Sequence, residues 1–344
     1  MTASGKYGIA GSGEGLSVDI YGGKLKLYGK ESATNNLSGC KLDETMVKTP
    51  KDAEYDSKLR GFAVNGKLVS DTLFLYLARY KVFIGEYQLN ENCCKDLSVI
   101  PYVKGKASYD PATGTLTLEN AKLSSGLIIK ENSTILVKGK CEINVVNSYE
   151  DYYGIRFESL DTAVIRGVDG GELKIKLTRS DNVYYYSEGI SIRPYHGDNV
   201  NVYIEDCDME INCDLPVYSY ISNSPDWERV GGNLNIVNSN VKLIPEYYPV
   251  LYLRDIKLSE CKITSPQNAI YDAWNCFYLE GDNTYYKGIL VIERDNAVGI
   301  ENIKSDVAAA KSDVYTIEGV KLNSAVENLP SGIYIINGKK VLKK

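Results

Sequence analysis

The chain has 344 residues, of which 44% are hydrophobic, and its formal net charge at pH 7 is −6. Its 39 basic and 45 acidic residues are scattered and not gathered into a basic block, which argues against nucleic-acid binding. No apolar run approaches the roughly 18 residues of a membrane span, and the single histidine, His196, excludes most histidine-based metal sites.

The N-terminal segment, MTASGKYGIAGSGEG, has neither the basic start nor the apolar core of a signal peptide. This leaves two interpretations, a cytosolic protein or a part of a longer secreted precursor. The glycine-rich stretch Gly11–Gly15 lacks the Gly-Lys-Ser/Thr of a phosphate-binding loop, so we interpret it as a connection between strands.

One short pattern recurs along the chain: alternating apolar residues, a polar residue or glycine, a small residue, and alternating apolar residues again. The alternation predicts two strands joined by a tight corner, each strand with one buried face. Because the chain turns tightly there, the corner has room only for Gly, Ala, Cys or Ser. The copies of the pattern are residues 18–27, 116–123, 137–145, 168–177, 202–211, 234–243 and 256–264.

Strands that open on glycine and an apolar residue precede several copies, at Gly126, Gly154 and Gly189. They begin 28 and then 35 residues apart. Units of this length without a helix are typical of the coils of a β-helix, which stack on their neighbours about 4.8 Å away. We predict an all-β protein, a right-handed parallel β-helix with a small C-terminal β unit. A β-sandwich is the alternative, although it leaves the recurring small corner unexplained.

These patterns divide the chain into four segments. Residues 1–78 contain one clear coil and look like the final coils of a truncated β-helix module, and residues 79–295 form a β-helix module of their own. Residues 296–312 are a polar linker. Residues 313–344 end in two short strands around Asn337-Gly338, which predicts a self-contained hairpin.

Three stretches of the long module carry a resemblance to a known family. They are KVFIGEYQLNENCCKDL (residues 81–97), VKGKASYDPATGTLTLENAKL (residues 103–123) and the later coils with GI openings and GGELKIKL (residues 170–177). Over residues 80–290 the chain resembles secreted bacterial β-helix proteins described as carbohydrate-binding. The resemblance implies the fold of pectate lyases and the binding of plant polysaccharides.

The C-terminal segment carries a second resemblance. Its residues are the strand with Tyr315 and Gly319, the run LPSGIY at Leu329–Tyr334, and the basic ending Lys339–Lys344. They resemble the C-terminal sorting domain of Bacteroidetes proteins that use the type IX secretion system. The resemblance implies an extracellular or cell-surface location, with the secretion machinery as a partner of the tail.

Three cysteines occupy the small corner position: Cys141, Cys207 and Cys261. Cysteines two coils apart would lie about 9–10 Å from each other, which is too far for a disulfide. We interpret them as small hydrophobic corner residues, in preference to bridges or metal ligands. The eight cysteines of the chain have no CxxC spacing that would specify a zinc site.

Tyrosine is the outlier of the composition, with 28 Tyr against 5 Phe and 2 Trp. Many tyrosines stand just before strand openings, so stacked coils would bring their rings to one edge. Such rings can bind sugars, because the C–H face of a pyranose packs on an aromatic ring; the alternative is a structural ladder of stacked rings. The candidate platform residues are Tyr152, Tyr153, Tyr184, Tyr185, Tyr186, Tyr247, Tyr248, Tyr285 and Tyr286, with Trp227 and Trp274 in flanking loops.

Acidic residues offer a calcium site of the kind found in pectate-lyase-like β-helices. Strand alternation puts Asp206 and Asp208 on one face, and Asp255 lies on a later coil. Calcium takes about six to eight converging oxygens, so solvated charges are the alternative interpretation. No other cofactor is predicted, and no residue stands out as catalytic.

The sequence therefore predicts a secreted or cell-surface module that binds glycans or acts as an adhesin without catalysis. The alternatives are a polysaccharide lyase or hydrolase of β-helix type, and a structural or protein-binding adhesin. The expected partners are a polysaccharide or glycan and, through the tail, the secretion machinery. Neither nucleic acid nor a membrane span is expected.

Overall fold

The computed structural model describes residues 1–21, 23–43, 45–147, 152–179, 186–194, 199–219, 231–272, 277–279, 284–295, 301–302, 314–316, 320–322, 326–336 and 339–343. Their regular structure is β, apart from two short 3-10 turns, Leu97–Val99 and Val326–Asn328. This confirms the predicted all-β class. In these ranges no helix is long and apolar enough to cross a membrane.

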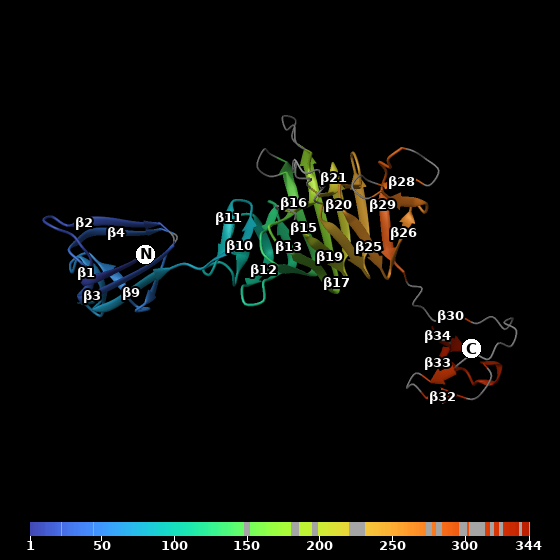
Figure 1. Ribbon diagram of the computed structural model, residues 1–344, viewed down its shortest axis with the longest axis horizontal. Helices are drawn as coiled ribbons and strands as arrows, with labels where there is room; N and C mark the ends of the chain where they lie inside the picture. Colours follow the sequence, from blue (N-terminus) through green and yellow to red (C-terminus); the bar gives the residue numbers. More distant parts are fainter. Residues whose placement is uncertain are drawn as a thin grey trace. The chain divides into compact units, whose positions relative to one another are not determined.

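The chain divides into two compact units (Figure 1). The first is Met1–Tyr80 together with Gln88–Cys94, and the second is Lys81–Tyr87 together with Lys95–Lys344.

The first unit contains two pairs of parallel strands, because β1 pairs with β3 and β2 pairs with β4. β9 then pairs antiparallel with β3, and β5 pairs antiparallel with β9. The core includes Leu27, Phe62, Leu73 and Leu75. The strands are β1 (Thr2–Ala10), β2 (Leu16–Tyr21), β3 (Lys24–Asn35), β4 (Leu37–Asp43), β5 (Val47–Thr49), β6 (Glu54–Asp56), β7 (Gly61–Val64), β8 (Lys67–Leu68) and β9 (Asp71–Tyr76).

Most strands of the second unit belong to two sheets and lie side by side in nearly the order of the sequence (Figure 1). The seven-stranded sheet contains, in spatial order, β11 (Tyr87–Asn90), β10 (Arg79–Ile84), β14 (Leu127–Ile129), β16 (Tyr153–Glu158), β18 (Glu188–Arg193), β21 (Leu215–Ser219) and β24 (Val250–Leu251), of which the strands from β14 onward lie wholly in the second unit. The eleven-stranded sheet contains β12 (Val103–Asp110), β13 (Thr115–Leu123), β15 (Ser133–Asn147), β17 (Thr162–Arg179), β19 (Asn201–Glu205), β20 (Asp208–Cys213), β22 (Asn233–Val237), β23 (Asn240–Pro245), β25 (Asp255–Ser259), β26 (Cys261–Ser265) and β29 (Leu290–Arg294).

The chain alternates between the two sheets, and we call one passage through both a coil. β16 leads to β17, β18 to β19 and β20, and β21 to β22 and β23. Strands of successive coils pair in parallel and in register: Ile155 lies beside Ile190, which lies beside Val217. These three side chains are buried. Because the register is kept, the inward residues form continuous apolar rows, and each coil is stabilised by its neighbours.

The corners inside the eleven-stranded sheet follow the sequence pattern. Asn120 and Asn238 adopt positive φ angles of 48° and 42°, a region that Asn tolerates better than most residues. The residues after them, Ala121 and Ser239, are fully buried. A left-handed residue bends the chain at this point, and the next side chain enters a corner that accepts only a small group.

The corner cysteines are buried or half-buried, and every described cysteine is a free thiol. Hydrogen bonds join corners of successive coils. The backbone N–H of Cys207 donates to Ser239 Oγ at 3.1 Å, and the backbone N–H of Ser239 donates to Cys261 Sγ at 3.2 Å. The small corner residues therefore satisfy backbone donors as well as filling space.

Antiparallel strands lie at the ends of the parallel stack in the second unit. β10 pairs antiparallel with β14, and β12 pairs antiparallel with β13. At the other end, β29 pairs antiparallel with both β23 and β26. The alternation of apolar residues in the sequence predicts strands here but does not give their direction.

The C-terminal residues form a five-stranded sheet of their own, and its final two strands pair antiparallel, with Ile336 opposite Lys339. Val314, Leu329, Tyr334, Ile336 and Val341 form its core. The remaining strands are β27 (Ala269–Tyr271) and β28 (Phe277–Leu279), a hairpin, and the C-terminal β30 (Glu301–Asn302), β31 (Val314–Thr316), β32 (Lys321–Leu322), β33 (Gly332–Ile336) and β34 (Lys339–Lys343).

Candidate functional site

Tyrosines stand at the entries to β16, β18, β24 and β29, as the sequence predicts. At three of these entries a backbone hydrogen bond joins the chain to a neighbouring coil. For example, the N–H of Glu188 donates to the carbonyl of Tyr152 at 2.7 Å, and the N–H of Tyr247 donates to the carbonyl of Asp214 at 3.0 Å. The described tyrosines at the four entries, here called the tyrosine edge, are Tyr152, Tyr153, Tyr186, Tyr247, Tyr248, Tyr285 and Tyr286.

Rings of the tyrosine edge meet in pairs from different coils. The ring centroids of Tyr186 and Tyr247 are 4.6 Å apart with an interplanar angle of 67°. Those of Tyr248 and Tyr285 are 6.5 Å apart at 83°. Both pairs are edge-to-face, which is a favourable aromatic geometry. These two described pairs are thus neither coplanar nor stacked face to face.

Exposure separates the members of the edge. Tyr186 is 48% exposed and Tyr285 is 45% exposed, whereas their partners Tyr247 and Tyr248 are half-buried. Tyr153 is only 3% exposed. Its ring is therefore not available to a ligand, contrary to the prediction that it belongs to a sugar platform. It fails because it is the first residue of β16 and its side chain lies in the interior.

Two further tyrosines of the edge are held by hydrogen bonds. Tyr152 is half-buried, and its phenol oxygen accepts a hydrogen bond from Arg193 Nη2 at 3.1 Å. The hydroxyl of Tyr286 donates to the carbonyl of Ile289 at 2.9 Å, and burial raises the pKa of this phenol. These groups support the local structure. The predicted residues Tyr184, Tyr185, Trp227 and Trp274 lie outside the described residues, as does His196.

A buried carboxylate adjoins the tyrosine edge. Glu188, at the start of β18, is 7% exposed and forms an ion pair with Arg193 Nη2 at 3.2 Å. Arg193 also donates from Nε to Ser191 Oγ at 3.1 Å. Burial raises the pKa of the Glu188 carboxyl, and the Arg193 guanidinium offsets this only in part. The ion pair fixes Arg193 against Tyr152, so it positions the aromatic edge.

The neighbouring strand holds a carboxyl group whose pKa is shifted in the opposite direction. Glu158 at the end of β16 pairs with Lys130 and, at 2.8 Å, with Arg156 Nη2. Burial alone would raise the pKa of this carboxyl, but the two cations together hold the pKa below its ordinary value. Glu158 and Glu188 are therefore both structural charges with named partners.

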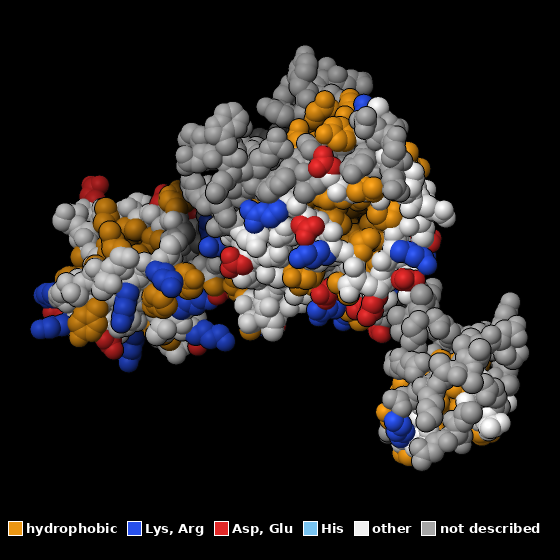
Figure 2. Space-filling view, turned by 45° about the vertical axis from the view of Figure 1, so that its right-hand side comes forward, with side chains coloured by type: hydrophobic (Ala, Val, Ile, Leu, Met, Phe, Trp, Pro, Cys, Tyr) orange, Lys and Arg blue, Asp and Glu red, His pale blue; other side chains and the backbone are white. Residues whose placement is uncertain are grey.

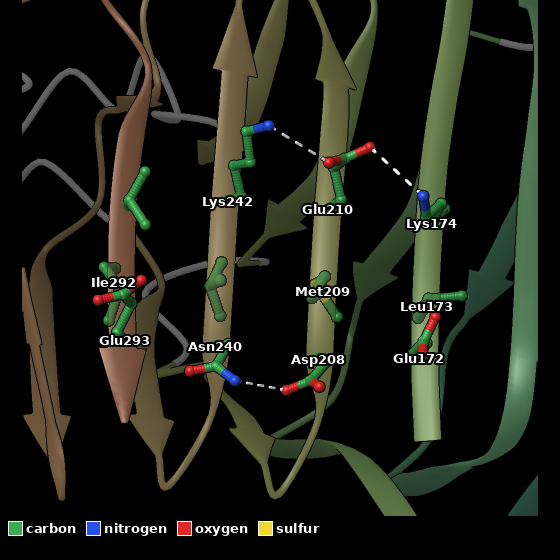
Figure 3. A pocket seen from close by; sticks show the side chains of 12 residues that line it. Glu172, Leu173, Lys174, Asp208, Met209, Glu210, Asn240, Lys242, Ile292 and Glu293 are labelled. Atoms are coloured by element: carbon green, nitrogen blue, oxygen red, sulfur yellow. Dashed lines mark hydrogen bonds and ion pairs between the residues drawn. The ribbon is translucent and has the colours of Figure 1, made fainter. Parts of the chain in front are cut away.

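An open groove of about 370 Å³ lies across β17, β20, β23 and β29. Glu210 lies between two lysines, 3.9 Å from Lys174 and 3.5 Å from Lys242 (Figure 3). Below this row, Asn240 Nδ2 donates to Asp208 Oδ1 at 2.8 Å (Figure 3). The charged residues alternate along each strand with the buried Leu173, Met209, Val241 and Ile292.

The same pairing of charges continues on the other strands of this sheet. Lys122 pairs with Glu142 at 3.3 Å, Lys140 with Glu172 at 3.4 Å, and Arg166 with Glu205 at 2.6 Å. In the space-filling view, acidic and basic side chains lie beside one another on the visible face (Figure 2). Exposed pairs of this kind contribute only about 0.2–1 kcal/mol each. They keep the face hydrated and its charges mutually neutralised.

The predicted calcium ligands do not come together. Asp206 accepts a hydrogen bond from Asn238 Nδ2 at 2.6 Å, Asp208 pairs with Arg294 Nη1 at 2.8 Å, and Asp255 pairs with Lys257 at 3.7 Å. Within the described ranges, no group of three or more Asp, Glu, Cys or His side chains is placed to hold a metal ion. The calcium site is wrong for these residues, because each carboxylate has a partner on its own or the next coil.

The sequence interpretation missed the Glu188–Arg193 pair. Glu188 and Arg193 are five positions apart on one strand, so strict alternation places them on opposite faces. The pair forms because Arg193 reaches back along the strand past Ser191. A charged residue directly before the Gly-Ile opening of β18 was the available signal.

Comparison of the chain with models of known protein families, with curated proteins and with solved structures finds no match.

Proposed function

We propose that the second unit is a non-catalytic glycan-binding or adhesive module that works outside the cell. The module is a right-handed parallel β-helix in this proposal. Two features support it: the chain alternates between two sheets, and successive coils pair in parallel and in register. Such a stack offers a long, regular surface along which an extended polymer can make repeated weak contacts.

The observation that carries the proposal is the pair of exposed tyrosines, each held by a half-buried partner. Tyr186 rests against Tyr247, and Tyr285 rests against Tyr248. An ordered ring loses little conformational entropy when a ligand binds, since a tyrosine side chain has only two rotatable χ angles and its partner already restricts them. Its open face suits the C–H face of a sugar, and its hydroxyl suits the sugar's hydroxyl groups.

A lyase or a hydrolase is a weaker proposal than a glycan-binding module, because the candidate carboxylates are held in ion pairs. The carboxylates Glu158, Glu188, Asp208 and Glu210 each have a cationic partner within 4 Å. A general acid or base needs a carboxyl group that faces the substrate with its pKa tuned for proton transfer. Carboxylates held in ion pairs suit a structural role better.

The test is a glycan array that includes pectins and host mucin glycans, with a turnover assay on every hit. Tyr186→Ala and Tyr285→Ala should each weaken binding about tenfold, which corresponds to roughly 1.4 kcal/mol. The matched control is Tyr21→Ala, because Tyr21 is 65% exposed but lies on β2 of the first unit. Unchanged affinity in both edge variants would falsify the proposal. Product formation would favour the enzyme alternative.

We further propose that residues 313–344 act as a secretion signal of the type IX kind. The separate core of the C-terminal sheet supports this, since a tag that is read by a receptor has to fold independently of its cargo. Deletion of Asp313–Lys344 should leave the protein inside the cell, as measured by surface labelling and fractionation. Surface display that survives the deletion would remove this proposal and leave the glycan-binding proposal intact.

A further inference from the structure

One face of the sheet in the first unit carries aromatic rings beside lysines. The leucines of β3 and β9 are buried in the core of this unit. Because side chains alternate along a strand, the residues between the leucines lie on the opposite face of the sheet. We call this surface the β3–β9 face, and its residues are Lys24, Lys26 and Tyr28 on β3 and Thr72, Phe74 and Tyr76 on β9.

The two rings of β9 on this face lie nearly parallel. The ring centroids of Phe74 and Tyr76 are 6.2 Å apart, and the interplanar angle is 18°. Both side chains are half-buried, and Tyr28 on the neighbouring strand is 39% exposed. Rings that lie nearly parallel on a sheet can pack against the C–H faces of neighbouring sugar units in one polymer. The described ring pairs of the tyrosine edge meet edge to face instead.

The pairing of β3 with β9 places a lysine beside each of these rings. Lys24 lies opposite Tyr76, and Lys26 lies opposite Phe74. Lys24 Nζ is 4.6 Å from the centroid of the Tyr76 ring, which is a cation–π distance. In the described part of the first unit, no ion pair joins either lysine to an acid. The rings therefore lie in a positive electrostatic environment.

The acidic residues of the same two strands do not neutralise this charge. Glu31 pairs with Lys6 at 3.1 Å and accepts a hydrogen bond from the Tyr7 hydroxyl at 2.7 Å. Asp71 lies opposite Gly29, at the far end of the pairing between the two strands. The eleven-stranded sheet of the second unit differs, because its lysines pair with acids on neighbouring strands. The β3–β9 face is thus complementary to an anion.

We propose that the β3–β9 face binds an acidic polysaccharide, a polymer of uronic acid units. The sugar rings pack on Phe74 and Tyr76, and their carboxylates pair with Lys24 and Lys26. These lysines are two residues apart on one strand, so their Cα atoms lie about 7 Å apart and can meet carboxylates of neighbouring units. An anionic membrane suits this face less well, because its two parallel rings are half-buried and do not project for insertion. The site belongs to the first unit and does not depend on the tyrosine edge.

The test measures binding of polygalacturonate by calorimetry. The full chain carries Tyr186→Ala and Tyr285→Ala throughout, so that the tyrosine edge contributes little. Adding Lys24→Gln and Lys26→Gln should weaken binding at least about tenfold in low salt. The loss should shrink in high salt, because salt screens exposed charges.

Three comparisons make the result specific. Lys58→Gln with Lys67→Gln removes the same charge from exposed lysines elsewhere in the first unit and should leave the affinity unchanged. Phe74→Leu keeps an apolar side chain but removes the ring, and it should weaken binding about tenfold, which corresponds to roughly 1.4 kcal/mol. Polygalacturonate whose carboxyl groups are methyl-esterified should bind at least about tenfold more weakly than the acid.

Three results would overturn the proposal. The first is equal affinity in the Lys24→Gln, Lys26→Gln variant and its lysine control. The second is full affinity in Phe74→Leu, which would reduce the contact to charge attraction. The third is lysine-dependent binding to vesicles of phosphatidylserine and phosphatidylcholine without binding to polygalacturonate, which would assign the face to a membrane. If Phe74→Leu fails to fold, the lysine variants still decide, and each of these results leaves the proposal for the tyrosine edge intact.

Discussion

The tyrosine edge and the charged face of the eleven-stranded sheet belong to the same coils but differ in how their side chains find partners. On the charged face, lysines such as Lys174 and acids such as Glu210 pair with each other across neighbouring strands. At the edge, Tyr186 and Tyr285 contact the rings of Tyr247 and Tyr248 and leave much of their surface in water. A surface whose charges are matched internally offers little to a ligand, whereas ordered apolar rings in water offer a great deal.

The largest effect should come from the buried member of the edge. Tyr153→Ala removes a ring that is 3% exposed, and we expect a loss of about 3–5 kcal/mol of unfolding free energy, as for other buried aromatic residues. Tyr186→Ala should cost less than about 1 kcal/mol, because its ring is half exposed. Chemical denaturation followed by circular dichroism measures both. Equal losses in the two variants would mean that the edge acts as one structural ladder.

A smaller effect should follow from Gly189→Ala, beneath the same edge. A Cβ at this position would lie 2.2 Å from the Cγ2 atom of Ile211 and 2.5 Å from the carbonyl oxygen of Pro216. Overpacking of this kind costs about 1–3 kcal/mol. Gly39→Ala is the control, since its nearest neighbour, Ser17 Oγ, is 3.3 Å away. If both variants melt at the same temperature, adjacent coils are less tightly packed than the contacts require.

The two carboxylates beside the edge should give opposite pH profiles. Because the folded pKa of Glu188 lies above its unfolded value near 4.3, its contribution to stability is greatest below that value and is lost as pH rises through the folded pKa. Glu158, with a lowered folded pKa, contributes stability above pH ~4.3 that is lost as pH falls through the folded pKa.

Glu188→Gln should therefore remove a fall in unfolding free energy with rising pH, and Glu158→Gln should remove a rise. Denaturant titrations at a series of pH values measure both slopes. If the slope changes have the same sign in the two variants, burial does not dominate the pKa of Glu188 while ion pairing dominates the pKa of Glu158.

The smallest effect belongs to the charged face. Lys242→Gln removes one of two cations that flank Glu210, and we expect a loss of no more than about 0.5 kcal/mol, which shrinks further with added salt. Glycan binding should stay at the wild-type level in this variant. A loss of binding there would move the ligand site from the tyrosine edge to the groove.

The local corner geometry was readable from the sequence, because it depends on neighbouring residues alone. Asn120-Ala121 and Asn238-Ser239 each pair a residue that tolerates positive φ with a small buried side chain, and both halves of this rule are visible in the letters. The antiparallel strands that close the stacks were not readable. Alternation in β12 or β29 gives a buried face but carries no information on strand direction, which depends on the connection in space.

The tyrosines show the same difference between local features, which the sequence predicts, and features that depend on how the coils stack. Their position at strand entries was predictable, but the separation of Tyr152 from Tyr153 was not drawn from the sequence. Adjacent residues of a strand point to opposite sides, so one of the two was bound to be buried. Which one depends on the register of β16 against β18, where Ile155 lies beside Ile190. Register is a property of the stacked coils and not of any single coil.

The buried thiols of the coils carry a consequence for the chemical environments that this chain tolerates. Cys207 is buried, and burial raises the pKa of its thiol to about 12; the pKa of the Cys213 thiol is raised further for the same reason. Thiol exchange and oxidation proceed through the thiolate, so these sulfurs react slowly. Each described cysteine is unbridged, so the described strands of the stacked coils are held together by apolar packing, hydrogen bonds and ion pairs. A change in the redox potential of the surroundings should therefore break no bond between the described strands of these coils.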